Sequence, residues 1–101
     1  MRYSNVVEAD AETLLVSSIK RLRGRAFKLK FIGLSGAPDR LVLMPGGRFY
    51  FVELKGPNGR LEDTQEILFP RLEELGFKVW ILKGVQEVQR FIQHLEMPDV
   101  L

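Results

Sequence analysis

Apolar side chains recur along the chain at two spacings, one typical of helices and one typical of strands. Three segments show the helical spacing of three or four residues, and each predicts an amphipathic helix. Short runs rich in aromatic and β-branched residues, bounded by glycine or proline, predict four strands. The expected elements are a helix from near Asn5, strands at 26–32, on both sides of 45–47 and at 79–82, a helix from Glu62 or Asp63 to Leu75, and a last helix carrying Val85 to Leu95.

The order of these elements predicts an α/β fold with a mixed β-sheet flanked by helices, in the order α-β-β-β-α-β-α. Three consecutive strands form an antiparallel meander, and a strand reached through a helix joins the sheet in parallel. With 101 residues the chain is the size of one domain, so we expect a single domain over residues 1–101.

Residues with large side chains are expected to fill the core of this fold. We expect Trp80, Phe49 and Phe51 to be buried in the core rather than to stack on nucleobases. The apolar stripe of the last helix is a core face, or part of a dimer face if one edge stays exposed. Pro70 lies inside the second helix and is expected to kink it or to cost hydrogen bonding.

The turn at residues 45–47 fixes which side chains meet across the central hairpin. Pro45 suits the first central position of a type I turn, and a following glycine can adopt the left-handed conformation that closes a three-residue loop. Such a loop places Asp39 opposite Glu53. A two-residue turn at 46–47 would instead place Asp39 opposite Leu54 and turn it to the other face. We favour the three-residue loop.

Asp39, Glu53 and Lys55 are then expected to share one face of the sheet. Glu53 and Lys55 are two residues apart on a strand, so their side chains point the same way. Two carboxylates in contact repel each other, and a hard divalent cation such as Mg²⁺ relieves that repulsion by binding their oxygens. Lys55 can orient or activate an attacking water, or stabilise negative charge that develops on phosphorus.

The order of these motifs resembles a known family, the VRR-NUC domains of the PD-(D/E)xK nuclease superfamily. The motifs are a helical Glu, Gly-x-Pro-Asp-Arg at 36–40, Pro-Gly-Gly at 45–47, Phe-Val-Glu-Leu-Lys at 51–55 and a later Gln. The resemblance implies a restriction-endonuclease-like core. It also implies that Asp39, Glu53 and the backbone carbonyl of Leu54 bind the metal, that Lys55 is the catalytic lysine, that Glu12 is the helical acid and that Gln65 is the glutamine of the next helix.

The roles of the acids and the glutamine on the helices remain open from the sequence. Glu8 is best explained as a helix-capping residue that forms a capping box with Asn5. Glu12 lies too far into the helix for capping, and it either reaches the metal through water, holds Lys55, or is a plain surface carboxylate. Gln65 lies on an apolar stripe and contacts either a water or phosphate at the site or a neighbouring backbone group.

The charge of the chain is unevenly distributed. Residues 1–60 hold 11 basic and 5 acidic side chains, whereas residues 61–101 hold 4 basic and 8 acidic ones. Such a basic region can neutralise phosphates, although cations also stabilise the C-terminus of a helix. The candidate nucleic-acid contacts are Lys20, Arg21, Arg23, Arg25, Lys28, Lys30 and Arg40, the last of which is either a phosphate clamp or structural.

These features together predict a Mg²⁺-dependent DNA endonuclease, in which Mn²⁺ is expected to substitute for Mg²⁺. The resemblance to stand-alone phage and bacterial members implies a homodimer that resolves four-way (Holliday) junctions. The alternatives are a nuclease for flap, nicked or unselective duplex DNA, and a non-catalytic DNA-binding module. Cysteine is absent, and no apolar run is long enough to cross a membrane, so we expect a soluble, intracellular protein. The resemblance implies that it is a cytoplasmic protein of a bacterial or phage-infected cell.

Overall fold

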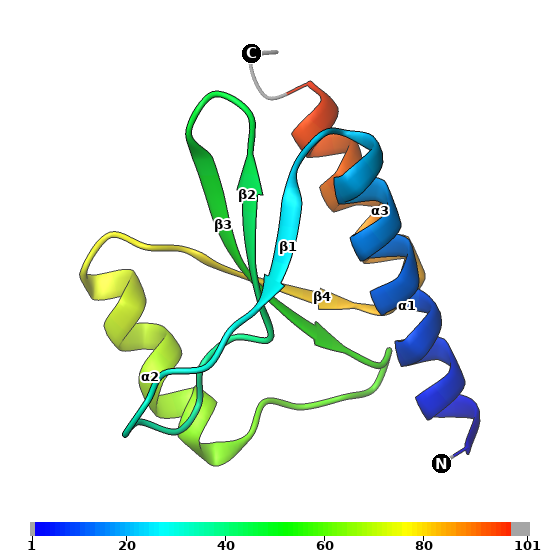
Figure 1. Ribbon diagram of the computed structural model, residues 1–101. Coiled ribbons are helices and arrows are strands. Elements are labelled where there is room, and N and C mark those ends of the chain that lie inside the picture. The colour runs from blue at the N-terminus through cyan, green and yellow to red at the C-terminus, as the bar shows by residue number, and fades with distance from the viewer. Residues whose placement is uncertain (1, 98–101) are drawn as a thin grey trace.

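Three helices and four strands follow one another in the expected order in the part of the chain that the computed structural model describes (Figure 1). That part is residues 2–97, with side chains from residue 9 onward. The elements are α1 (Arg2–Arg21), β1 (Arg25–Lys28), β2 (Arg40–Met44), β3 (Arg48–Lys55), α2 (Asp63–Glu74), β4 (Val79–Lys83) and α3 (Gly84–Glu96). The order α-β-β-β-α-β-α and the mixed sheet are thus confirmed.

The four strands form one sheet in the order β1-β2-β3-β4. The pairs β1–β2 and β2–β3 are antiparallel, whereas β3 and β4 are parallel because α2 carries the chain back between them. In the central hairpin Met44 pairs with Arg48 and Leu41 with Phe51, which is the register of a three-residue loop. Gly46 and Gly47 both have positive φ, so the loop has the expected length and register but is not the expected type I turn, which has negative φ at its second central residue.

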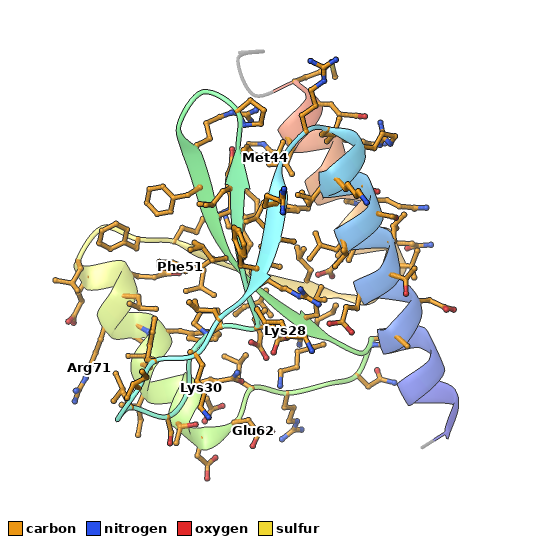
Figure 2. All side chains as sticks on the ribbon, viewed as in Figure 1. Lys28, Lys30, Met44, Phe51, Glu62 and Arg71 are labelled. Atoms are coloured by element: carbon orange, nitrogen blue, oxygen red, sulfur yellow. The ribbon has the colours of Figure 1, made fainter. Side chains whose placement is uncertain are left out.

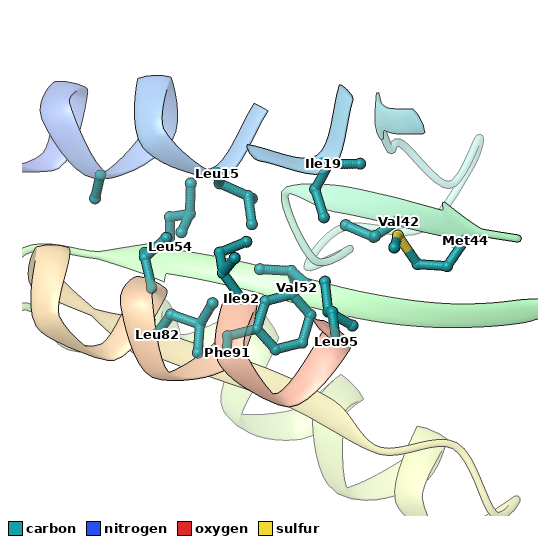
Figure 3. Close-up of a cluster of buried hydrophobic side chains, with 12 residues drawn as sticks. Leu15, Ile19, Val42, Met44, Val52, Leu54, Leu82, Phe91, Ile92 and Leu95 are labelled. Atoms are coloured by element: carbon teal, nitrogen blue, oxygen red, sulfur yellow. The ribbon is translucent and has the colours of Figure 1, made fainter. Parts of the chain in front are cut away.

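The main core lies between one face of the sheet and the helices α1 and α3, which lie side by side across it (Figures 1 and 3). Leu15 and Ile19 of α1 are fully buried there, and Phe91 of α3 is 2% exposed. The sheet contributes alternate residues, among them Val52 and Leu54, because successive side chains of a strand point to opposite faces. The neighbours of Val52 and Leu54, which are Glu53 and Lys55, therefore face the other way.

Helix α2 covers only part of the opposite face. Leu68 and Phe69 of α2 pack with Val79 in a second, smaller cluster, against which Phe51 also packs. Phe49 lies beyond the reach of α2 and is 46% exposed, so its expected burial in the core is wrong. The uncovered part of the sheet forms an apolar surface with a hollow of about 620 Å³, lined by Leu29, Phe31, Leu41, Leu43, Met44, Gly47, Arg48, Phe49 and Phe51.

Two element boundaries differ from the sequence-based expectation. The backbone of α1 is helical from Arg2, three residues before Asn5; the side chains of Asn5 and Glu8 lie outside the described part. The strand expected at 26–32 is only Arg25–Lys28, because the chain leaves β2 after Leu29 and turns at Gly33.

The other helices end close to where the sequence predicts. Glu62 is the N-cap of α2, and the helix continues through Pro70 and stops at Glu74, before Gly76 with its positive φ. Helix α3 ends at Glu96, and Pro98 lies outside the described residues. None of the helices within residues 2–97 combines the length and the apolar character needed to span a membrane.

Candidate active site

Two carboxylates, those of Asp39 and Glu53, meet where β2 begins and β3 nears its end. Asp39 lies one residue before β2, and continuing the β2–β3 register places it opposite Glu53. The backbone N–H of Asp39 donates a hydrogen bond to Glu53 Oε1 at 3.0 Å. The backbone N–H of Leu54 donates a hydrogen bond to Asp39 Oδ2 at 2.9 Å. Each carboxylate is therefore held by the backbone of the opposite segment.

The segment before Asp39 is packed tightly against the start of α2. Pro38 is among the fully buried side chains. Gly36 has a φ of +101°, and a Cβ atom built on it would lie 2.7 Å from the carbonyl oxygen of Thr64. A larger residue would need both a strained backbone and movement of α2. The glycine and proline of the Gly-x-Pro-Asp-Arg motif thus fix the position of Asp39.

Glu53 lies beneath Asp39 and is paired with Lys55. The Glu53 side chain is 2% exposed, and its Oε2 lies 3.3 Å from Lys55 Nζ. The Lys55 side chain is only 13% exposed. The alternation along β3 turns both side chains away from the α1–α3 core, as the sequence predicts. An ammonium group is therefore held beside a buried carboxylate.

The pKa of Glu53 is raised above its ordinary value. Burial is the largest cause because it penalises the charged form, and the negative charge of Asp39 raises the pKa further. A hydrogen bond from Gln65 and the charge of Lys55 act in the opposite direction, but they do not cancel the increase. The site therefore carries an electrostatic cost in its charged form, and a bound cation would remove it.

Gln65 has two partners, one in the backbone and one in the site. Its Oε1 accepts a hydrogen bond from the backbone N–H of Glu62 at 3.0 Å, which closes the start of α2. The same side chain hydrogen-bonds Glu53. Gln65 is 6% exposed. The backbone partner that the sequence left as an alternative is thus present, and Gln65 orients Glu53 from the start of the helix.

Glu12 pairs with Arg40 rather than with Lys55. Arg40 donates from Nη2 to Glu12 Oε2 at 2.6 Å and from Nη1 to the carbonyl oxygen of Ala26 at 2.9 Å. Its side chain is 11% exposed. Arg40 therefore joins α1, β1 and β2, which supports the structural alternative for this residue. Glu12 is half-exposed and faces the same pocket as Asp39.

A pocket of about 510 Å³ opens beside Asp39, between α1 and the end of β1. Asp39 is exposed and lines the pocket, whereas Glu53 is buried and does not line it, so a ligand entering the pocket meets Asp39 first. The pocket is lined by Ala9, Glu12, Lys28, Leu29, Ala37, Pro38, Asp39, Arg40 and Leu54. Its walls thus combine two carboxylates with two cationic side chains.

The oxygen atoms near Asp39 suit a divalent cation whose coordination shell is only partly filled by the protein. Among the residues that the structure describes, no three His, Cys, Asp or Glu side chains gather closely enough to hold a metal ion alone. Two carboxylates with an unfavourable mutual charge remain, and Mg²⁺ characteristically binds one or two carboxylates and completes its shell with water and phosphate oxygens. The residues therefore fit a metal that is shared with a substrate.

Sequence comparison identifies the family. The family model of the VRR-NUC domain matches residues 3–86. The chain belongs to the VRR-NUC family. The curated protein "Putative nuclease p44" of Acyrthosiphon pisum secondary endosymbiont phage 1 is 39% identical over 75 residues, which are 74% of this chain and 81% of that protein.

The fold of this VRR-NUC chain agrees with a solved structure of the same family. A chain described as a VRR_NUC domain superposes with a TM-score of 0.79 and 31% sequence identity, and the match covers 86% of this chain and 95% of that one. The sheet and helices that carry Asp39, Glu53 and Lys55 are therefore the family fold.

The basic residues of the VRR-NUC chain do not all lie together. Lys20, Arg23 and Arg25 line a hollow of about 420 Å³ at the end of α1, and Lys28 lines the pocket beside Asp39. Lys30 follows Lys28 into the loop after β1 (Figure 2). Arg21 differs because its Nη1 lies 3.4 Å from Glu96 Oε2 of α3. Arg21 is thus separated from the others by its ion pair, whereas the partly buried Arg40 lines the same pocket as Lys28.

Apart from Lys30 and the motif at 36–40, no function was predicted for the loop after β1, although Leu29, Ala37 and Pro38 line the pocket. Ile32 was expected within a strand, whereas it is 98% exposed. The available signal was Gly33 between Ile32 and Leu34, because a glycine within an apolar run indicates a turn.

Proposed function

We propose that this VRR-NUC domain is a Mg²⁺-dependent, structure-selective DNA endonuclease that hydrolyses phosphodiester bonds, most readily at four-way junctions and as a homodimer. The family supports nuclease activity, and a relative carries the name of a nuclease. The observation that carries the proposal is the cluster of Asp39, Glu53 and Lys55, of which Asp39 lines an open pocket.

Asp39, Glu53 and the Leu54 carbonyl are the groups that would hold the cation, with Mn²⁺ as a substitute for Mg²⁺. When bound, the cation would polarise the scissile phosphate and lower the pKa of a water molecule. Asp39 is the more exposed of the two acids, and the Leu54 N–H already fixes one of its oxygens. This arrangement limits the motion of the carboxylate and so reduces the entropy lost on binding.

Lys55 is the group best placed to act on the water and on the phosphate. Its Nζ is held by Glu53 Oε2, so the ammonium has a fixed direction before any substrate arrives. A fixed positive charge stabilises the negative charge that develops on a phosphate oxygen. Gln65 contributes indirectly because it orients Glu53. Glu12 contributes through Arg40, which fixes β1 against β2.

DNA is the substrate that the charges favour. Lys28 borders the pocket, and the hollow lined by Lys20, Arg23 and Arg25 continues the positive surface toward the end of α1. Lysine and arginine side chains neutralise backbone phosphates without reading the base sequence. Selectivity for DNA shape rather than for sequence agrees with such a surface.

The homodimer is proposed from the symmetry of the substrate. A four-way junction is resolved by two cuts related by two-fold symmetry, and the described part of the chain holds one pair of carboxylates with one lysine. Two copies related by a two-fold axis supply two such sites. The mass of the free protein in solution tests this step, and a mass equal to one chain would contradict it.

The decisive experiment compares wild type with Lys55→Ala on labelled four-way junction, flap, splayed and linear duplex DNA, with Mg²⁺, with Mn²⁺ and with a chelator. We expect wild type to cut the junction in either metal and not in the chelator. Loss of one positioned charge-stabilising group should lower the cleavage rate by about 10²- to 10³-fold.

Lys78→Ala is the matched control, because Lys78 lies at the other end of β4, where its Nζ packs 4.2 Å from the Trp80 ring centre. It should cut like wild type. Cleavage that persists in the chelator or in Lys55→Ala would contradict the mechanism. Equal cutting of linear duplex would contradict the preference for junctions, and metal-independent binding without any cleavage would favour a DNA-binding module.

A further inference from the structure

The loop between β1 and β2 carries exposed apolar side chains beside the pocket. Ile32 is 98% exposed and Leu34 is 54% exposed. Isolated exposed apolar residues are common, but a nearly fully exposed isoleucine at a loop tip gains nothing from the fold of this chain. These two side chains are therefore available to a ligand, and they lie next to a hollow of about 430 Å³ formed by residues 29–31 and 33–37.

The tip of the loop is anchored and not free to collapse onto the protein. Phe31 packs against the cluster of Leu68, Phe69 and Val79, so the residue before Ile32 is fixed in the second core. The N–H of Leu34 donates a hydrogen bond to the carbonyl oxygen of Phe31 at 3.3 Å, and the φ of Gly33 is +80°. A glycine with positive φ at the third position is what a type II turn requires. The turn thus holds Ile32 outward.

The base of the same loop is tied directly to Asp39. The N–H of Leu29 donates a hydrogen bond to the backbone carbonyl of Asp39 at 3.0 Å, which closes the loop at its base. At the other side Gly36 packs against Thr64 at the start of α2. Leu29 and Ala37 line both the pocket beside Asp39 and the hollow under the loop tip. Whatever the tip contacts is therefore placed at a fixed distance from Asp39.

The charges around the tip select the kind of ligand. Lys28 and Lys30 are exposed and precede Ile32 by four and two residues (Figure 2). Cationic side chains beside an exposed apolar tip fit nucleic acid, which presents phosphates and apolar base faces together. Proteins that distort DNA use apolar side chains as wedges between base pairs in the same way.

We propose that Ile32 and Leu34 form a wedge that enters the base stack at a branch point and places the adjacent phosphate in the pocket beside Asp39. This inference rests on the proposed function, because it assumes that DNA occupies that pocket. It deepens the proposal by assigning selectivity for branched DNA to a loop. At a branch point the strands of one helix part into different arms, so opening the stack there moves two arms apart, and a wedge enters more easily than within a continuous duplex.

The test compares wild type with the double variant Ile32→Ser, Leu34→Ser on a four-way junction that carries 2-aminopurine next to the branch point. The fluorescence of this base rises when it loses its stacking neighbours. Ca²⁺ replaces Mg²⁺, so that binding and unstacking are measured apart from hydrolysis, and a parallel gel in Mg²⁺ measures cleavage. Leu75→Ser is the matched control, because Leu75 is 72% exposed and follows the other end of α2.

We expect wild type and Leu75→Ser to raise the fluorescence, and the double variant to lose the rise and to bind the junction about tenfold more weakly. Its affinity for linear duplex should stay within about twofold, because phosphate contacts dominate there. Equal fluorescence and equal junction affinity in wild type and the double variant would overturn the wedge. The wedge would also be overturned if the double substitution changed the oligomeric mass of the DNA-free protein and the variant still unstacked the junction, because the tip would then contact a second copy.

Failure of the nuclease proposal gives a different result. Wild type that unstacks the junction in Ca²⁺ but cuts nothing in Mg²⁺ would support the wedge and contradict hydrolysis. Wild type that cuts the junction without any fluorescence change would support hydrolysis and contradict the wedge. Wild type that binds neither the junction nor the duplex would overturn both.

Discussion

Glu53 shows how one buried side chain combines stability with chemistry. Its carboxylate is 2% exposed and accepts a hydrogen bond from the Asp39 backbone, while Lys55 and Gln65 contact it from the same face of the sheet. Burial and the nearby Asp39 still raise its pKa. Because the charged form of Glu53 is unfavourable in the free protein, a bound divalent cation stabilises that form more than it would stabilise a surface carboxylate.

The raised pKa predicts a pH dependence of stability in the metal-free protein. The folded state holds the Glu53 proton more tightly than the unfolded state, so this group's contribution falls as pH rises above about 4.5, the ordinary value, through the folded-state pKa. The free energy of unfolding of wild type should therefore decline relative to that of Glu53→Gln over this window. Chemical denaturation of both proteins in a chelator at several pH values measures it.

Magnesium supplies the control for the pH prediction. At neutral pH, Mg²⁺ should raise the unfolding midpoint of wild type and leave that of Glu53→Gln almost unchanged, because binding to the folded state alone stabilises a protein. If the free energy of unfolding changed with pH in the same way in both proteins, the raised pKa of Glu53 would be contradicted. If Mg²⁺ raised both unfolding midpoints equally, the role of Glu53 as a metal ligand would be contradicted.

At the scale of elements, the start of α2 and the loop before β2 position the site together. Gln65 closes the first turn of α2 and contacts Glu53, and Gly36 packs against Thr64 of the same helix. The helix therefore orients one carboxylate through a side chain and the other through the backbone that leads to Asp39. A shift of α2 should therefore move both carboxylates.

Substitutions at two glycines distinguish the effect of the Gly36–Thr64 contact from the effect of backbone strain. Gly36 and Gly46 both have positive φ, but a Cβ at Gly46 meets nothing within 4 Å, whereas one at Gly36 meets the Thr64 carbonyl oxygen at 2.7 Å. Gly46→Ala should cost about 1–2 kcal/mol of stability from the left-handed backbone and keep its cleavage rate. Gly36→Ala should cost more and lose cleavage. Urea denaturation and cleavage assays measure both, and equal effects would contradict the role of the Thr64 contact.

At the scale of the whole molecule, the positive side chains are grouped and not merely numerous. The net charge is only +2, yet Lys20, Arg23 and Arg25 gather at the end of α1 and Lys28 borders the pocket. Arg21 lies beside this group in sequence, but it points to Glu96 of α3. A DNA backbone that runs from the pocket along β1 would meet the first group and miss Arg21.

The salt dependence of binding tests this grouping. The slope of log affinity against log salt counts the phosphates that are neutralised, so the double variant Lys20→Ala, Arg23→Ala should reduce its magnitude by about 2. Arg21→Ala should change it little. Fluorescence anisotropy with labelled duplex at several salt concentrations measures the slopes. A larger effect for Arg21→Ala than for the double variant would show that DNA follows a different surface.

Local sequence patterns are enough to predict the order of the elements and the hairpin that carries the site. The order α-β-β-β-α-β-α follows from apolar spacing, and the three-residue loop at Pro45 fixes the register that brings Asp39 to Glu53. Both features depend on neighbours within a few residues, because turn geometry and the alternation of a strand are local. The face shared by Glu53 and Lys55 is fixed for the same reason.

The partners that those side chains meet depend on packing between segments that are distant in sequence. Glu12 could have held Lys55 but pairs with Arg40, and Phe49 could have been buried but lies beyond the end of α2. Ile32 is a residue type common in strands, yet it lies in a loop with its side chain exposed to solvent. A periodic pattern states which side chains share a face, whereas the element that covers that face is set by packing between segments far apart in sequence.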